Sequence, residues 1–146
     1  NSIGMILNKA KEFKDLPVVF TGDLNFIEKS LGYRDITADV LKDTKVLAKD
    51  TMNSATFHNA DPNAFKDIVL DYILINDGFK ALKYEVVKKK YNNRYISDHY
   101  AVVANIQVVS RGWPAVVAHS SVLILDSIIT KNILSFWLVL TPTLKW

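Results

Sequence analysis

Three apolar, strand-like runs in this chain each meet a carboxylate, and this combination limits how the chain can fold. The runs and their polar neighbours are residues 18–20 with Asp23 and Asn25, residues 68–75 with Asp71, and residues 101–109 with Asp98 and His99. A carboxylate in an apolar run loses much favourable hydration unless another group pairs with it. We therefore expect these polar side chains to converge at one end of a β-sheet.

The composition of the 146 residues is that of an ordinary globular domain, with 49% hydrophobic and 23% charged residues. It excludes a disordered chain, a collagen-like chain and a small disulfide-stabilised protein. The absence of cysteine excludes zinc sites with Cys ligands, iron–sulfur clusters and thiol nucleophiles, and it leaves the cellular compartment undetermined. The net charge of +3 permits an anionic partner but does not by itself indicate one.

Hydrophobic spacing predicts helices on both sides of the first strand. Apolar residues recur at helical spacing over residues 3–13, and Pro17 follows the end of this helix. After the strand, Asn25 is positioned to cap a helix that begins within residues 27–31. Residues 37–41 have the pattern of another short helix.

The middle of the chain is predicted to be rich in β-structure. Residues 55–58 form a short strand or the lead-in to one, and residues 68–75 form a buried strand. The Asn76-Asp77-Gly78 turn then predicts a β-hairpin with residues 79–87, which alternate apolar and polar side chains. The apolar residues 101–109 predict the last strand.

The segment after residue 109 differs in composition from the residues before it. Its charged residues are only Arg111, Asp126, Lys131 and Lys145. We therefore divide the chain into residues 1–109 and an atypical hydrophobic tail, residues 110–146, whose role is unknown. The charge-free windows of the tail are shorter than the roughly 18 apolar residues of a membrane-spanning helix, so no transmembrane span is predicted. Apolar residues between Val122 and Leu140 recur at helical spacing and predict an amphipathic helix.

Each polar group, considered alone, also has a structural explanation. Asp23 followed by Asn25 is typical of a turn with an Asx cap. A single acid within a strand, such as Asp71, commonly faces solvent at a sheet edge or pairs with a lysine. A single His99 is more often a structural histidine than a catalytic one. The functional interpretation depends on the three groups occurring together.

Together, and in their order along the chain, these groups resemble the carboxy-terminal motifs of the endonuclease/exonuclease/phosphatase family. The matching segments are Pro17-Val18-Val19-Phe20-Thr21-Gly22-Asp23-Leu24-Asn25, Thr56-Phe57-His58, Leu70-Asp71-Tyr72-Ile73-Leu74 and Ser97-Asp98-His99. The family consists of metal-dependent phosphoesterases and includes deoxyribonuclease I, exonuclease III and neutral sphingomyelinases. The resemblance covers about residues 5–109. It implies an α/β fold, half of a layered α/β sandwich on a mostly antiparallel β-sheet.

The resemblance also implies roles for the polar residues. By similarity, the catalytic residues are Asp23, Asn25, Asp71 and His99, and the ligands of a Mg²⁺ or Mn²⁺ ion are Asp98 and Asp23. His99 acts as general base or electrophile at the phosphate, while Asp71 holds its other ring nitrogen. Asp23 orients the attacking water or the metal ion, and Asn25 donates to a phosphoryl oxygen. We expect the Asp71 carboxylate about 2.6–3.2 Å from a ring nitrogen of His99.

Two further expectations follow from the resemblance. Neighbouring strand residues point to opposite faces, so Asp98 and His99 require an irregular lead-in, which residues 95–97 offer. Relatives take a glutamate metal ligand and a second histidine from an amino-terminal half that has no counterpart here. With Asn1 as the first residue, this predicts a fragment of a phosphoesterase that is inactive alone and exposes the apolar inner face of its sheet.

The substrate class is left open by the sequence. The parent enzyme would hydrolyse phosphodiester or phosphomonoester bonds by in-line attack of water on nucleic acid, a phospholipid headgroup or a small phosphate ester. Lys88, Lys89 and Arg94 are candidate substrate-binding residues, because basic residues between aromatic residues bind backbone phosphates and stack on bases. A solvated hairpin tip explains the same pattern. The competing function is a non-enzymatic binding or interaction module, and the oligomeric state is undetermined.

Overall fold

The computed structural model describes residues 2–52, 54–109, 121–125 and 136–139. The helices in these ranges are α1 (Ser2–Glu12), α2 (Leu31–Thr37) and α3 (Thr44–Leu47). The strands are β1 (Val18–Asp23), β2 (Lys42–Asp43), β3 (Asp50–Thr51), β4 (Asp71–Ile75), β5 (Phe79–Val87), β6 (Ala101–Val108), β7 (Ser121–Leu125) and β8 (Phe136–Val139). The predicted first helix corresponds to α1, and the three apolar runs correspond to β1, β4 and β6.

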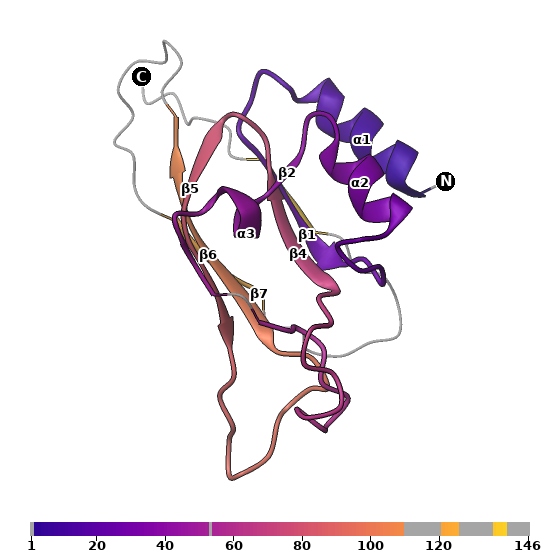
Figure 1. Ribbon diagram of the computed structural model, residues 1–146. Coiled ribbons are helices and arrows are strands. Elements are labelled where there is room, and N and C mark those ends of the chain that lie inside the picture. Colours follow the sequence, from indigo (N-terminus) through magenta and orange to yellow (C-terminus); the bar gives the residue numbers. More distant parts are fainter. Residues whose placement is uncertain (1, 53, 110–120, 126–135, 140–146) are drawn as a thin grey trace.

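The described strands form two four-stranded sheets that face each other. One sheet has the order β2-β4-β1-β8 and the other has the order β3-β5-β6-β7. The described strand pairs are antiparallel except β3 with β5. Helices α1 and α2 lie on the outer face of the β1–β4 sheet, and the other sheet lies on its inner face (Figure 1). The predicted fold class, a layered α/β sandwich with mostly antiparallel strands, is confirmed.

Strands β1 and β4 are buried on both faces, which explains their continuous apolar sequence. Val18 and Phe20 belong to the core under α1 and α2, whereas Val19 and Ile73 belong to the core between the two sheets. Strand β5 instead alternates buried residues with more exposed ones, as expected for a strand with one covered face.

The expectation of an exposed apolar inner face is wrong, because the second sheet packs against it. The residues that form this core include Val19, Ile73, Ile75, Phe79, Tyr84, Val102 and Ile106. They come from β1 and β4 in one sheet and from β5 and β6 in the other. The chain therefore supplies strands to both layers of the sandwich.

The Asn76-Asp77-Gly78 turn does not form the predicted hairpin, because it carries the chain from one sheet to the other. β4 pairs with β1 and β2, whereas β5 pairs with β6 and β3. The Oδ1 atom of the buried Asn76 accepts hydrogen bonds from the N–H groups of Val18 at 2.9 Å and Gly78 at 3.1 Å. Its Nδ2 donates to the carbonyl of Leu16 at 2.7 Å. The side chain thus anchors the turn to the start of β1.

Of the two short helices predicted after β1, the structure forms one. Helix α2 begins after Ser30, whose Oγ accepts a hydrogen bond from the N–H of Tyr33 at 3.2 Å. Asn25 does not cap it, because its backbone is left-handed with φ 52° and its side chain donates to Asp23. Residues 38–41, which were part of the second predicted helix, lie beyond the end of α2.

The tail was predicted to form an amphipathic helix between Val122 and Leu140. The structure forms strands β7 and β8 there instead, so the prediction is wrong for residues 122–125 and 136–139. β7 pairs with β6, and β8 pairs with β1. Strand edges leave N–H and C=O groups unpaired, and these two strands supply partners for β6 and β1. The remainder of the tail lies outside the described residues, and the division of the chain at residue 109 stays a prediction. Within the part that the structure describes, no helix has the length and hydropathy needed to cross a membrane.

Replacing Asn76 with alanine is expected to lower the free energy of unfolding by at least about 2 kcal/mol, because it leaves buried backbone groups without partners. Urea unfolding followed by circular dichroism measures the change. Asn8→Ala, at an exposed position of α1, is the control and is expected to change stability by less than about 0.5 kcal/mol. Equal stability of the two variants would contradict the anchoring role.

Candidate active site

Asp23 and Asp71 lie opposite each other at the ends of neighbouring antiparallel strands. Asp23 is the last residue of β1, Asp71 is the first residue of β4, and the two are partners in the strand register. Because side chains alternate along a strand, Asp23 shares the face of Val19 and Asp71 shares the face of Ile73. Both carboxylates therefore lie at one end of the sandwich, on the face that packs against the other sheet.

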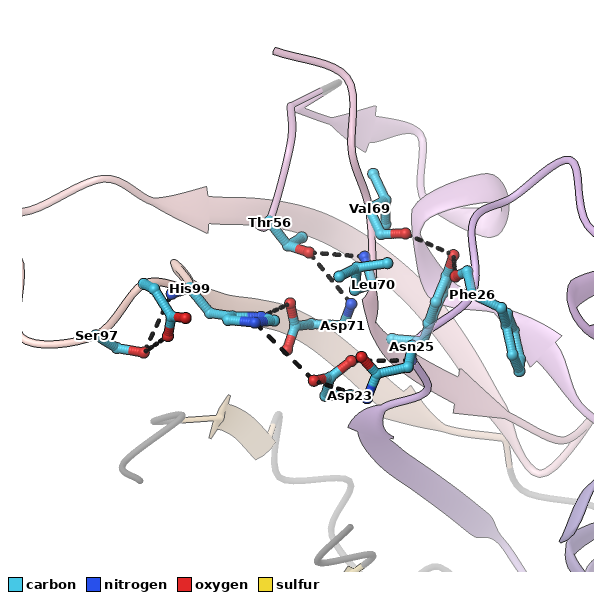
Figure 2. A network of polar contacts seen from close by, with 11 residues as sticks. Asp23, Asn25, Phe26, Thr56, Val69, Leu70, Asp71, Ser97 and His99 are labelled. Atoms are coloured by element: carbon cyan, nitrogen blue, oxygen red, sulfur yellow. Dashed lines mark hydrogen bonds and ion pairs between the residues drawn. The ribbon is translucent and has the colours of Figure 1, made fainter. Parts of the chain in front are cut away.

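His99 approaches these carboxylates from the other sheet, two residues before β6 begins. Its Nδ1 lies 2.8 Å from Oδ2 of Asp71, within the expected range (Figure 2). A carboxylate only accepts, so Nδ1 carries the hydrogen of this bond. The side chains of His99 and Asp71 are 14% and 9% exposed. The pair is thus a largely buried contact between the two layers.

The second ring nitrogen of His99 faces Asp23. Nε2 lies 3.9 Å from Oδ2 of Asp23, which is too long for a hydrogen bond. Asn25 orients this carboxylate: its backbone N–H donates to Oδ1 at 2.9 Å and its Nδ2 donates to Oδ2 at 3.3 Å. The structure therefore brings Asp23, Asn25, Asp71 and His99 together (Figure 2).

Asp98 lies beside this group but not within it. The chain bends over residues 96–98, so Asp98 and His99 leave from an irregular segment, as predicted. The Ser97 hydroxyl accepts the N–H of His99 at 3.1 Å and donates to Oδ1 of Asp98 at 3.4 Å. Asp98 is exposed to solvent. The potential ligand atoms of Asp23, Asp71 and His99 lie within 4.8 Å of one another, and Asp98 is not part of this group.

The charges of the group act on one another. The pKa of His99 is raised above its ordinary 6.5, mainly by the hydrogen bond to Asp71, with the negative charges of Asp71, Asp23 and Asp98 adding to the rise against the effect of burial. The pKa of Asp23 is raised above its ordinary 3.8, mainly by burial and further by the charges of Asp71 and Asp98. A protonated His99 is therefore favoured beside these carboxylates.

The donor atoms of the group fit part of a magnesium or manganese site. Mg²⁺ binds oxygen ligands and commonly takes one or two carboxylates while it keeps several waters. Asp23 meets this requirement because its carboxylate is partly exposed, whereas Asp71 is engaged by His99. Asp98 adds a second exposed carboxylate nearby. Among the described residues, no glutamate joins the Asp23, Asp71 and His99 group.

No family model and no curated protein matches this chain. Solved structures match over most of its length. The mannosyl-6-phosphatase of Bacteroides thetaiotaomicron is 28% identical over 72% of this chain, with a TM-score of 0.66. An endonuclease/exonuclease/phosphatase family protein of the same organism is 29% identical over 69% of the chain, with a TM-score of 0.63. One from Bacteroides vulgatus is 26% identical over 74% of the chain, with a TM-score of 0.65.

In fold and over most of its length, the chain resembles solved proteins of the endonuclease/exonuclease/phosphatase family. One of these solved relatives is named as a phosphatase. The match covers 44%, 41% and 43% of the three solved chains, so this chain spans less than half of their length.

Of the three predicted substrate-binding residues, Arg94 lines a cavity and the two lysines do not. The cavity has a volume of about 550 Å³, and its lining includes Lys90, Arg94 and Asp98. The Nζ atoms of Lys88 and Lys89 lie over the rings of Tyr100 and Tyr91, at 5.4 Å and 5.1 Å from the ring centroids. Lys90 belongs to the same basic stretch of sequence but was not among the three predicted residues, and it lines the cavity with Arg94.

Residues 56–58 support the site, a role that sequence reasoning missed. Phe57 forms an isolated antiparallel bridge with His99, and the two rings pack edge to face with centroids 4.9 Å apart. His58 is fully buried and packs against the rings of Tyr95 and Tyr100, whose centroids lie 4.4 Å and 4.2 Å from its own. The only sequence signal for this role is the resemblance of the Thr56-Phe57-His58 triplet to the family.

Replacing Asp71 with asparagine is expected to lower the pKa of His99, because the Asp71 hydrogen bond is the main cause of its rise. Proton and ¹⁵N NMR titration of the ring measures the pKa. The pKa of His99 is higher in the folded chain than in the unfolded chain. The contact between protonated His99 and Asp71 therefore stabilises the folded chain fully below about pH 6.5, and this stabilisation is lost as the pH rises through the folded-state pKa of His99. The stability difference between wild type and Asp71→Asn is therefore expected to be larger at mildly acidic than at alkaline pH.

Asp35→Asn is the control for this comparison, because it removes the same charge from an exposed position of α2. It is expected to leave the pKa of His99 unchanged. An unchanged His99 pKa in Asp71→Asn, or an equal fall in both variants, would show that the hydrogen bond is not the cause.

Proposed function

We propose that this site hydrolyses phosphate esters by attack of water at phosphorus. The observation that carries the proposal is the Asp71–His99 pair, whose free Nε2 faces the carboxylate of Asp23 at 3.9 Å. A water molecule can contact both atoms at about 2.8 Å from each. The phosphoesterase class of the family supports this assignment.

In this proposal, His99 is the positive group at the phosphate. Asp71 accepts the hydrogen of Nδ1, which fixes the ring with Nε2 toward the reacting groups. The raised pKa keeps more of the ring protonated near neutral pH. The Nε2–H group then offsets the negative charge that grows on the phosphoryl oxygens in the transition state.

Asp23 is the base. Its carboxylate takes a proton from the water as the water oxygen bonds to phosphorus, the bond from phosphorus to the leaving oxygen breaks, and solvent protonates that oxygen. Burial and the neighbouring carboxylates raise the pKa of Asp23, which makes it a stronger base. Asn25 holds the carboxylate in place and has a second Nδ2–H for a phosphoryl oxygen.

Asp23 and Asp98 would hold the divalent cation, because both carboxylates have exposed oxygens. A bound Mg²⁺ or Mn²⁺ ion supplies further positive charge for the phosphoryl and leaving oxygens. Mg²⁺ commonly takes one or two carboxylates from a protein, and waters or phosphate oxygens of the substrate fill its other positions. We propose that residues outside this chain supply further ligands, which agrees with the limited share of the solved relatives that it spans.

The 146-residue chain alone is expected to show no magnesium-dependent hydrolysis of p-nitrophenyl phosphate or bis(p-nitrophenyl) phosphate. A longer natural protein that contains it is expected to hydrolyse at least one of them. Release of nitrophenolate with Mg²⁺ or with EDTA measures both. In the longer protein, His99→Ala and Asp23→Asn are expected to lower kcat by about two orders of magnitude or more, whereas Asp35→Asn keeps full activity.

Two results would count against this proposal in different ways. Turnover by the 146-residue chain, lost with EDTA and in His99→Ala, would show that no outside ligands are needed. Inactivity of the longer protein on both esters and on nucleic acid would favour the non-enzymatic binding module instead.

A small phosphate ester such as a sugar phosphate is the substrate class that the cavity favours. The cavity is an open pocket beside Asp98, and Lys90 and Arg94 place positive charge there that can bind the phosphate of a small ester. The solved mannosyl-6-phosphatase is a relative with such a substrate in its name. Lys88 and Lys89, outside the cavity, are the feature that favours nucleic acid.

In the active protein, Arg94→Ala is expected to raise KM for a sugar phosphate about tenfold with little change in kcat, because Arg94 binds substrate and transition state alike. Lys89→Ala is the matched control and is expected to leave KM unchanged. Steady-state kinetics measure both. If Lys89→Ala instead weakens binding of a DNA oligonucleotide while Arg94→Ala leaves KM for the sugar phosphate unaltered, the substrate is nucleic acid.

A further inference from the structure

We propose that Thr56 is the positioning residue that sets the contact between Asp71 and His99. These two residues come from different sheets, and the described strands β4 and β6 are not neighbours in a hydrogen-bonded ladder. Their 2.8 Å contact therefore depends on whatever links the start of β4 to the start of β6. Residues 56–59 form that link.

The hydroxyl of Thr56 holds the start of β4. Its Oγ1 accepts hydrogen bonds from the N–H groups of Leu70 at 3.0 Å and Asp71 at 3.2 Å (Figure 2). Thr56 is 0% exposed, so water cannot replace its hydroxyl as the acceptor. This buried side chain thus adds two hydrogen bonds to the backbone contacts that hold the start of β4.

The backbone of the same segment holds His99. The N–H of Tyr100 donates to the carbonyl of Thr56 at 2.7 Å, and the N–H groups of His58 and Asn59 donate to the carbonyl of Asp98 at 3.0 Å and 3.1 Å. His99 lies between these anchored residues. A displacement of Thr56 would therefore move His99 relative to Asp71.

Asp23 is connected to Thr56 through one further residue. The N–H of Leu24 donates to the carbonyl of Leu70 at 2.9 Å, and the N–H of Leu70 donates to Thr56. The end of β1, the start of β4 and the lead-in to β6 are thus linked at Thr56. Thr56 acts through these backbone groups rather than by touching the reacting atoms.

The test compares two substitutions of Thr56 in the 146-residue chain with a matched control. Thr56→Val keeps the shape but removes the acceptor, whereas Thr56→Ser keeps the acceptor. Thr44→Val is the control, because Thr44 is equally buried and its hydroxyl donates to the Ile73 carbonyl of the same strand at 2.8 Å. The readout is the tautomer of the neutral His99 ring, from ¹⁵N chemical shifts at alkaline pH, with the urea-unfolded chain as reference.

Wild type, Thr56→Ser and Thr44→Val are expected to keep the Nδ1–H tautomer that the Asp71 contact favours. In the folded wild type, the fraction of the Nδ1–H tautomer is expected to exceed that in the unfolded chain. In Thr56→Val, this difference is expected to fall by more than half. An unchanged tautomer in Thr56→Val, or an equal loss in Thr44→Val, would overturn the proposal. If Thr56→Val does not fold, Thr56→Cys gives the same comparison, because its thiol is a much weaker acceptor.

The effect on catalysis rests on the proposed function, whereas the tautomer readout does not. In the active longer protein, Thr56→Val is expected to lower kcat by roughly tenfold to a hundredfold with KM nearly unchanged, and Thr56→Ser is expected to restore kcat to within about twofold. A similar loss of kcat in Thr44→Val would overturn the positioning role. Inactivity of the wild type would overturn the proposed function and leave the tautomer result to decide the role of Thr56.

Discussion

The hydrogen bond between Asp71 and His99 is the interaction on which the arrangement of this site depends. Asp71 and Asp23 are opposite partners on neighbouring strands, and like charges in that position repel each other. The imidazole of His99, placed between them from the other sheet, offsets this repulsion when it is protonated. This one contact therefore joins the two layers of the sandwich and reduces the repulsion between Asp23 and Asp71.

The burial of the strand pair β1–β4 explains why its carboxylates lie at one end and the amide of Asn76 lies at the other. Both strands are covered by helices on one face and by the second sheet on the other, so a polar side chain in their middle would be buried without water. Asn76 satisfies backbone groups at one end, and Asp23 with Asp71 meets Asn25 and His99 at the other. At both ends of the strand pair, buried polar groups are thus stabilised by hydrogen bonds to neighbouring residues.

This constraint also explains how much could be predicted from the sequence. Carboxylates beside apolar runs are anomalies, so Asp23, Asp71 and the strands that carry them were found from the residues alone. The hairpin at Asn76 was predicted wrongly, because a turn motif does not reveal that the flanking strands belong to different sheets. The role of Thr56 could not be predicted, because its partners are backbone N–H groups fourteen and fifteen residues away, which leave no side-chain pattern.

The positioning of the acid–base group and the proposed binding of a cation depend on different contacts. Every hydrogen bond that links Asp23, Asp71 and His99 to one another or to Thr56 is made by residues between Asp23 and Tyr100. Among the described residues, the potential metal-binding group is Asp23, Asp71 and His99, and Asp71 is already engaged by His99. The geometry at His99 therefore follows from local contacts of this chain, whereas the proposed binding of a cation also involves ligands from outside the chain.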